Sequence, residues 1–327
     1  MDISAFIPIL LLTLAYGYLN GLHGSAIIVA TSISSRAIHP RLAILIAAIT
    51  IGLGPVVLGV AVANTIGKEL LVADAIQPSV IVSGLVGAVV WSAVTFWAKI
   101  PSSISQSLFG GLIGAAIAYD GMTAIQSQGL IKILTALFLS PVLGLICAFF
   151  LVRLIYALTV NATPHINRYF NRLQLMVTIV MGLAFGANDG QKIIAMFALG
   201  LLSTQMTDSF VIPLWIIVIS GCTISLGALI GGWRLIKTLG GKFYKIRPVH
   251  GFGAQLSAGA IILGSAIVGA PISGTQVVTT SILGAGSADR IQKVRWHVAQ
   301  QILIGWILTI PLSALIATIA YHGLFRG

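Results

Sequence analysis

Long stretches without Asp, Glu, Lys or Arg constrain this chain more than any other feature. Most of them are long enough to cross roughly 30 Å of hydrocarbon as a helix. They are residues 3–35, 42–67, 75–98, 100–119, 133–152, 209–233, 248–288 and 296–325. Because lipid offers no partner to the open edge of a sheet, every span is expected to be helical. The chain is predicted to be an all-α polytopic membrane protein.

Composition agrees with a membrane protein and argues against a nucleic-acid-binding one. Hydrophobic residues make up 57% of the sequence and charged residues only 8%, a balance that water-soluble domains do not have. The formal net charge is +11, but the basic residues lie in short loops between apolar runs rather than on one solvated face. The first apolar run follows Met1 and Asp2 with no basic segment, so we expect it to stay in the mature protein.

Two pairs of sequence signals indicate an internal repeat. The pattern P-x-S-x-[ST]-Q occurs at 101–106 and again at 271–276, and each copy is followed eight residues after its Gln by Gly-Ala. The second pair is Asn20 and Asn188, each preceded by a short stretch of aromatic and glycine residues. The members of each pair lie about 170 residues apart, which is the signature of a duplicated unit.

Equivalent loops of the two halves carry opposite charge. Residues 65–78 hold one Lys and two acids, whereas residues 234–247 hold five Lys and Arg residues. Two further loop pairs agree, and cytoplasmic loops are the ones that collect Lys and Arg. We therefore predict two inverted-topology repeats, 1–158 and 159–327, an arrangement typical of secondary transporters with a site near the midplane. The loops expected on the cytoplasmic side lie near 36–41, 159–170, 234–249 and 289–295.

The two proline motifs predict broken or re-entrant half-helices. Proline is favoured at the first helical position, so Pro101 and Pro271 each indicate a helix that begins inside a long uncharged region. A helix N-terminus carries about half a positive charge and binds oxyanions through its free N–H groups. The side chains expected to contact such an anion are Ser102, Ser103, Ser105, Gln106, Ser273, Thr275 and Gln276. The alternative is that these hydroxyls only pack between membrane helices.

The stretch GANDGQK places an acid and a base in the middle of an apolar segment. A helix that starts at Arg172 would carry them about 24 Å along its axis, to a depth where an ionisable group indicates function. Asp189 and Lys192 are three positions apart and can pair on one helix, so a purely structural ion pair is the alternative. We expect Asn188, Gln191 and Lys192 to contact the anion, and Asp189 and Asn188 to serve a coupling cation or proton.

The corresponding stretch in the first half, NGLHGSA, has a titratable histidine but no acid. We expect Asn20 and Ser25 to contact the anion. Asn20 and His23 are the candidates for coupling in this half.

These motifs resemble the repeated signatures of the PiT family of inorganic phosphate transporters. The matching stretches are GANDGQK, NGLHGSA, IPSSISQSLFGGLIGA at 100–115 and GAPISGTQVVTTSILGAGSADRIQKVRWHVA at 269–299, with WRLIKTLGGKFYKIRPVHGFGAQ at 233–255 also similar. The resemblance implies a helical carrier of about twelve membrane segments, usually a homodimer, that moves phosphate with a coupling cation. It also implies that the Asn-Asp motifs and the half-helices surround the phosphate and its cations.

The sequence departs from the family pattern at positions that bear charge or bind cations. Gly24 stands where the family has Asp in a motif similar to N-G-F-H-D-T-A-N, and Ile27 stands where it has the second Asn. Gln106 and Gln276 occupy places where His is frequent, and Gln255 one where Glu is common. The chain therefore offers less charge for holding two metal cations than the family usually does.

Electrostatics nevertheless requires a coupling ion. Moving a divalent phosphate inward against 100 mV costs about 4.6 kcal/mol, at about 2.3 kcal/mol per charge. We expect coupling to protons, or to fewer sodium ions than in the family, with His23 and Asp189 as the titrating groups. No metal site is certain from the sequence; Asp189 is the candidate for sodium, and no organic cofactor is expected.

Three alternatives remain from the sequence. A permease for sulfate or another tetrahedral oxyanion would keep the fold, although the intact GANDGQK favours phosphate. A membrane receptor or scaffold that transports nothing is compatible with the missing acid. An intramembrane hydrolase is disfavoured, because Ser25 and His23 point to different sides of a helix, so the protein is predicted not to be an enzyme. The expected partners are phosphate, membrane lipids and a second copy, in the cell membrane.

Overall fold

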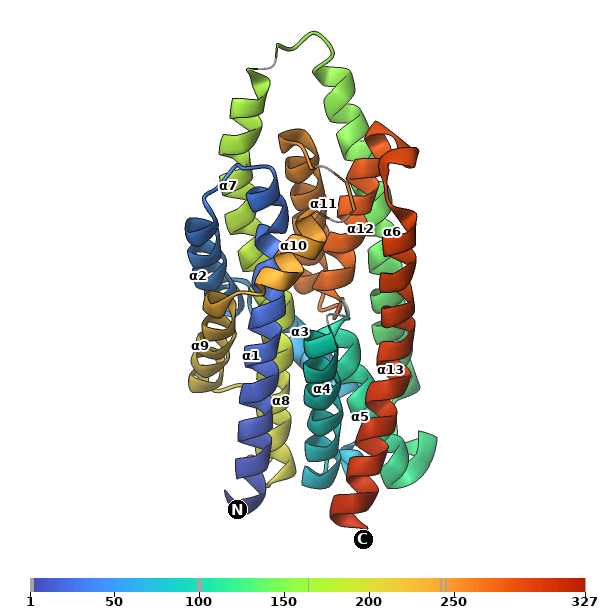
Figure 1. The fold of residues 1–327 in the computed structure, drawn as a ribbon. Coiled ribbons are helices and arrows are strands. Elements are labelled where there is room, and N and C mark those ends of the chain that lie inside the picture. Colours follow the sequence, from blue (N-terminus) through green and yellow to red (C-terminus); the bar gives the residue numbers. More distant parts are fainter. Residues whose placement is uncertain (1–2, 99–101, 164, 242, 245, 327) are drawn as a thin grey trace.

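The computed structural model describes residues 3–98, 102–163, 165–241, 243–244 and 246–326 (Figure 1). Within these ranges the regular elements are helices, and Leu71 and Ile125 form an isolated antiparallel bridge. Pro101, where a helix start was expected, lies outside the described residues. The all-helical prediction is confirmed for the described part of the chain.

The same order of helices occurs twice along the chain. The first series is α1 (Ile3–Ser34), α2 (Pro40–Leu58), α3 (Ala61–Glu69), α4 (Pro78–Ala98), α5 (Ile104–Asp120) and α6 (Ser127–Leu158). The second series begins with α7 (Ile166–Phe185), the π-helical segment η3 (Gly186–Gly190) and α8 (Gln191–Ser203). It continues with α9 (Leu214–Ile230), α10 (Trp233–Gly241), α11 (Pro248–Ile267), α12 (Gly274–Asp289) and α13 (Trp296–Phe325). The short 3-10 turns are η1 (Ala73–Ala75), η2 (Gly121–Ala124) and η4 (Ile291–Lys293).

Six helical segments in the described residues are long and apolar enough to cross a membrane. They are α1, α2, α4, α6, α13 and the continuous stretch Ile166–Ser203 formed by α7, η3 and α8. The apolar helix α9 has 17 residues, and the helices α5 and α12 have 17 and 16 residues. The protein is therefore a multi-pass membrane protein that combines long helices with several shorter ones.

The short helices α5 and α12 begin later than the prolines predict. Each begins three residues after its proline, because a serine caps it: Ser103 accepts the backbone N–H of Gln106 at 3.1 Å, and Ser273 that of Gln276 at 3.3 Å. A serine at this position satisfies one of the free N–H groups of the first turn. Pro271 therefore precedes the helix instead of forming its first residue.

Each of these short helices crosses the long terminal helix of the other half at a glycine. A side chain at Gly114 in α5 would collide with the carbonyl of Ala314 in α13, and one at Gly284 in α12 with the carbonyl of Leu145 in α6. Small residues at such crossings let membrane helices approach closely. The Gly-Ala pair that follows both serine motifs is thus a packing feature, and it fixes where α5 and α12 lie.

Glycine contacts also show which residues occupy equivalent positions in the first helices of the two halves. A side chain at Gly21 in α1 would collide with the carbonyl of Ile224 in α9. One at Gly186 in η3 would collide in the same way with the carbonyl of Ile51 in α2. Gly21 and Gly186 are therefore equivalent positions, 165 residues apart.

This register corrects the sequence-based pairing of Asn20 with Asn188, which are 168 residues apart. With a separation of 165 residues, His23 stands at the position equivalent to Asn188, and Gly24 at the position equivalent to Asp189. The pairing of the two asparagines was wrong because a shared residue type is a weaker guide to register than the contacts that each helix makes.

Figure 1 shows how the repeated helices are placed. The helices α4 and α5 lie in the lower half of the molecule, and α11 and α12 in the upper half. The loops at 35–39, 159–163 and 290–295 lie in the upper part, whereas the N- and C-terminal helices end at the bottom. The N-termini of α5 and α12 consequently face each other near the middle of the bundle.

Candidate functional site

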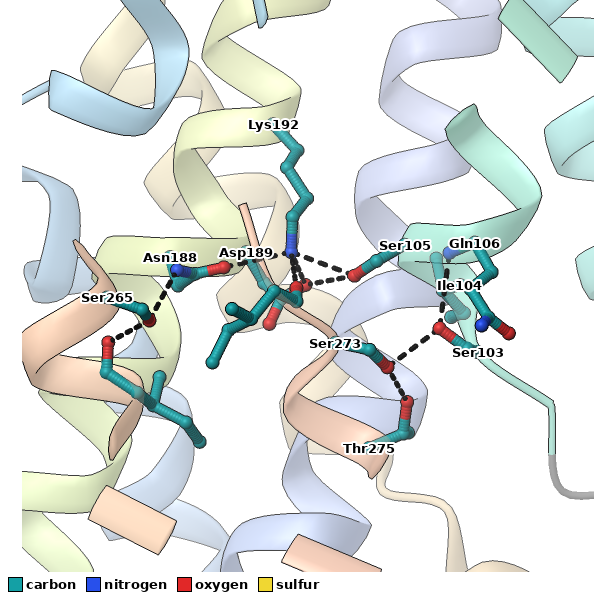
Figure 2. Close-up of polar contacts among 12 residues, drawn as sticks. Ser103, Ile104, Ser105, Gln106, Asn188, Asp189, Lys192, Ser265, Ser273 and Thr275 are labelled. Atoms are coloured by element: carbon teal, nitrogen blue, oxygen red, sulfur yellow. Dashed lines mark hydrogen bonds and ion pairs between the residues drawn. The ribbon is translucent and has the colours of Figure 1, made fainter. Parts of the chain in front are cut away.

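The caps of the two short helices touch each other. Ser103 Oγ and Ser273 Oγ lie 2.7 Å apart, and Ser273 Oγ is 2.9 Å from Thr275 Oγ1 (Figure 2). Both serines are fully buried. The positive ends of two helices and a chain of three hydroxyl groups therefore meet at one point inside the protein.

A buried ion pair lies beside these caps. The Lys192 ammonium is 2.6 Å from Asp189 Oδ1, and both side chains are almost completely buried. Lys192 also donates to Asn188 Oδ1 at 3.0 Å, Ser105 Oγ at 2.8 Å and the Ile272 carbonyl at 2.7 Å. Ser105 donates in turn to Asp189 Oδ1 at 3.0 Å. The cluster thus joins three predicted site residues of the second half, Asn188, Asp189 and Lys192, to Ser105 of the first half.

The π-helical segment η3 supplies the acid and the amide of this cluster. Asn188 directs its Nδ2 away from Lys192, to Ser265 Oγ at 3.1 Å and the Ala270 carbonyl at 3.0 Å. A π-helical turn inside an α-helix often occurs at a functional position. Here it lies between two glycines, Gly186 and Gly190, at the segment's ends. Ser265 was not predicted, because no motif surrounds it in the sequence.

Three other predicted residues make structural contacts elsewhere. Gln191 turns away from the cluster, and its Oε1 accepts the N–H groups of Val62 at 2.6 Å and Ala63 at 3.1 Å at the start of α3. Ser102 bonds Thr95 Oγ1 at 2.7 Å. Ser25 donates to the Leu22 carbonyl of its own helix at 3.3 Å.

The polar residues of α1 are buried but only partly satisfied. His23 Nδ1 lies 2.9 Å from the Leu19 carbonyl, and its ring packs edge-on against Phe96. Among the described residues, neither His23 Nε2 nor Asn20 Nδ2 has a hydrogen-bond partner. The hydroxyl of Tyr16, one turn before Asn20, is buried in the same way. Sequence reasoning missed Tyr16, because an aromatic residue in an apolar run ordinarily indicates packing.

The two motif glutamines face a different space. Gln106 and Gln276 line a cavity of about 250 Å³ between α5, α6, α12 and α13, whose other lining residues, such as Phe138 and Trp306, are mainly apolar. The side-chain oxygen of each glutamine finds no partner in the described part of the chain. The capping serines therefore face the centre where α5 and α12 meet, whereas the glutamines of the same motifs face the apolar cavity.

Phe185 packs against Gly24, the position where the resemblance predicts an acid. A Cβ atom at Gly24 would lie 2.5 Å from Phe185 Cε1, and one at Gly274 would lie 2.6 Å from Cε2 of the same ring. The phenyl ring thus occupies the space where a carboxylate on α1 would project. A side chain at position 24 would therefore require this ring to move.

Unpartnered polar atoms in this region indicate that something else contacts them. Asp189 Oδ2 has no hydrogen-bond partner among the described residues, although it is buried. Buried polar atoms in proteins are nearly always bonded, so an exception points to an ion, a water or a ligand. A region with helix N-termini, hydroxyl donors, a lysine and a free carboxylate oxygen can bind an anion beside a cation.

The fold and this centre define a class: a multi-pass helical membrane protein in which two short helices begin at a buried, charged site. A sequence profile of the Phosphate transporter family matches residues 20–168 and again 158–317. The chain belongs to the phosphate transporter family.

Individual relatives agree with this assignment. A probable low-affinity inorganic phosphate transporter of Bacillus subtilis (strain 168) is 36% identical over 98% of both chains. One of Rhizobium meliloti (strain 1021) is also 36% identical over 98% of both chains. The solved structure of "The sodium-dependent phosphate transporter" shares the fold, with a TM-score of 0.87, 22% identity and coverage of 98% of this chain and 99% of that one. These relatives are named as transporters and not as enzymes, which confirms the predicted family and the non-enzymatic class.

Proposed function

We propose that the protein is a cation-coupled symporter of inorganic phosphate that works by alternating access. One observation carries the proposal: the capped N-termini of α5 and α12 meet through Ser103 and Ser273, beside the buried pair of Asp189 and Lys192. Relatives named as low-affinity inorganic phosphate transporters support the choice of substrate.

The proposal includes two inverted repeats, 1–158 and 159–327, with about 12 membrane segments in total. The repeated order of helices and the exchange of partners between halves, α5 on α13 and α12 on α6, support it. The short helices occupy opposite ends of the bundle and begin at a common centre (Figure 1). In this proposal the loops at 36–41, 159–170, 234–249 and 289–295 lie on the cytoplasmic side of the cell membrane, an orientation that their positive charge supports.

Phosphate would bind at the helix caps. The hydroxyls of Ser103, Ser273 and Thr275 bond one another in this conformation, and each can rotate to donate to an oxyanion instead. The two helix N-termini together contribute about one positive charge. Ser105 is shared with the ion pair, so it would connect the anion to Asp189 and Lys192. Of the other predicted contacts, Asn188 belongs to the Lys192 cluster, and Asn20 on α1 has an amide nitrogen without a partner among the described residues. Ser25, Ser102 and Gln191 bond other groups in this conformation, and Gln106 and Gln276 face the apolar cavity.

Coupling would use Asp189 and His23, with Asn188 and Asn20 beside them. Asp189 Oδ2 and His23 Nε2 are both buried acceptors without a partner in the described residues, so each can take a proton or face a cation. Sodium remains a coupling ion to test, because a structure with the same fold is titled sodium-dependent. The proposed carrier uses no organic cofactor, and it functions as a homodimer in a lipid bilayer.

Uptake by the purified protein in proteoliposomes tests this proposal. Radiolabelled phosphate should accumulate under an imposed proton or sodium gradient, and unlabelled sulfate should not compete. Asn188→Ala and Asp189→Asn should abolish uptake, whereas Lys132→Ala, in the exposed pair with Glu69, should retain it. Competition by sulfate at equal concentration would favour a general oxyanion permease. Failure of the wild type to take up phosphate under any gradient would favour a receptor.

A further inference from the structure

Among the described residues, the hydrogen-bond partners of the Lys192 ammonium are all oxygen atoms, which form a cage around it (Figure 2). Its partners are Asp189 Oδ1 at 2.6 Å, the Ile272 carbonyl at 2.7 Å, Ser105 Oγ at 2.8 Å and Asn188 Oδ1 at 3.0 Å. An ammonium group has only three donors, so the cage uses its entire hydrogen-bonding capacity. Because the side chain is fully buried, bulk water does not reach the ammonium.

Such a cage has the composition of an alkali-cation site. It combines a carboxylate, an amide oxygen, a hydroxyl and the carbonyl of a non-helical residue just before α12, and irregular backbone of this kind coordinates coupling ions in transporters. Asp189 neutralises one positive charge. A second cation in the same dry space would be repelled strongly at this range, because the low dielectric weakens screening. The cage can therefore hold the ammonium or a sodium ion, but not both.

The equivalent positions of the first half support a paired role for the acid and the base. Gly24 and Ile27 are separated from Asp189 and Lys192 by the same 165 residues that separate Gly21 from Gly186. Both are buried and neither bears charge. The acid and the cation are thus present together in one half and absent together from the other, as expected if each exists to compensate the other.

We propose that Lys192 is a tethered cation that takes the place of a coupling sodium ion, so that this carrier binds no sodium in the Asp189 cage. The ammonium supplies the positive charge beside the phosphate site permanently. A coupling sodium ion would therefore have to bind outside this cage, whereas a proton can still bind Oδ2 of Asp189, which has no partner among the described residues. This inference rests on the proposed transport function. Its test therefore measures sodium binding directly, independently of phosphate uptake.

Two substitutions of Lys192 distinguish the effect of its charge from the effect of the volume it fills. Lys192→Ala removes the ammonium and leaves room for a cation beside Asp189, whereas Lys192→Met removes the charge but fills the volume with an apolar chain. In equilibrium binding of radioactive sodium to the purified full-length protein, we expect the alanine variant to bind about tenfold more than wild type, a difference that a modest site preference produces. The methionine variant and the wild type should stay at background. Adding Asp189→Asn to the alanine variant should abolish the binding.

Matched measurements keep the proposal refutable. Lys132→Ala removes the same residue type from an exposed pair and should bind no more sodium than wild type. A monodisperse Lys192→Ala protein that binds no sodium would overturn the proposal. If that variant does not fold, the wild type decides: sodium binding that Asp189→Asn removes would overturn the proposal, and its absence would support it. Loss of phosphate uptake in every condition would instead refute the transport function and leave the sodium result standing.

Discussion

The buried pair of Asp189 and Lys192 gives the sharpest quantitative prediction. Replacing Asp189 by Asn keeps the shape of the side chain but leaves the Lys192 ammonium buried without a counter-charge. Breaking one partner of a buried ion pair typically costs about 3–5 kcal/mol. Because Lys192 keeps oxygen partners on Ser105, Asn188 and Ile272, we expect the lower end, about 3 kcal/mol.

The chain contains its own control for this prediction. Lys132 and Glu69 form an ion pair of similar length, 2.9 Å, but their side chains are 41% and 44% exposed. An exposed pair is worth only about 0–1 kcal/mol. Glu69→Gln should therefore change the free energy of unfolding by less than about 1 kcal/mol, although it removes the same kind of partner from the same kind of base.

Thermal unfolding of the purified protein in detergent measures both effects. Asp189→Asn should lower the melting temperature by several degrees, and Glu69→Gln should leave it nearly unchanged. The double variant Asp189→Asn with Lys192→Met removes both charges and should recover most of the lost stability, because uncharged replacements of a buried pair are often neutral. If Asp189→Asn melts like the wild type, or the double variant melts below it, the pair does not carry a buried charge as described.

Two further predictions concern backbone and packing. Gly24→Ala should destabilise the protein by about 1–3 kcal/mol through overpacking, because its Cβ would lie 2.5 Å from Phe185 Cε1. Gly264→Ala is the control: no atom of the described residues lies within 4 Å of its new Cβ, so the substitution should be neutral or stabilising in the same melting assay. Arg36 has a φ of 60° and Gln205 a φ of 54°, in the left-handed region that favours glycine. Arg36→Gly and Gln205→Gly should each raise the stability by up to about 1 kcal/mol, and a melting temperature lowered by both would contradict the assigned backbone strain.

The sequence by itself determined the helical class and the positions of the polar segments. Apolar runs longer than the membrane is thick leave no alternative to helices, and the serine motifs predicted two short helices whose caps the structure places face to face. Asp189 and Lys192 were predicted to pair, because residues three apart on a helix are neighbours. Each of these predictions depends on interactions between residues close in sequence or on the burial of apolar residues in the membrane.

Only the tertiary structure decided which polar groups meet. Gln191 follows directly on the Asn-Asp motif, yet it caps α3, because the helix presents successive side chains in different directions. The carbonyl of Ile272 completes the lysine cage, but a backbone oxygen has no signature in the residue sequence. The space beside Gly24 is filled by the phenyl ring of Phe185 from the other half, a contact that the sequence does not reveal. Contacts between segments 80 or more residues apart depend on how the helices pack, and that packing selects the partners of each buried polar atom.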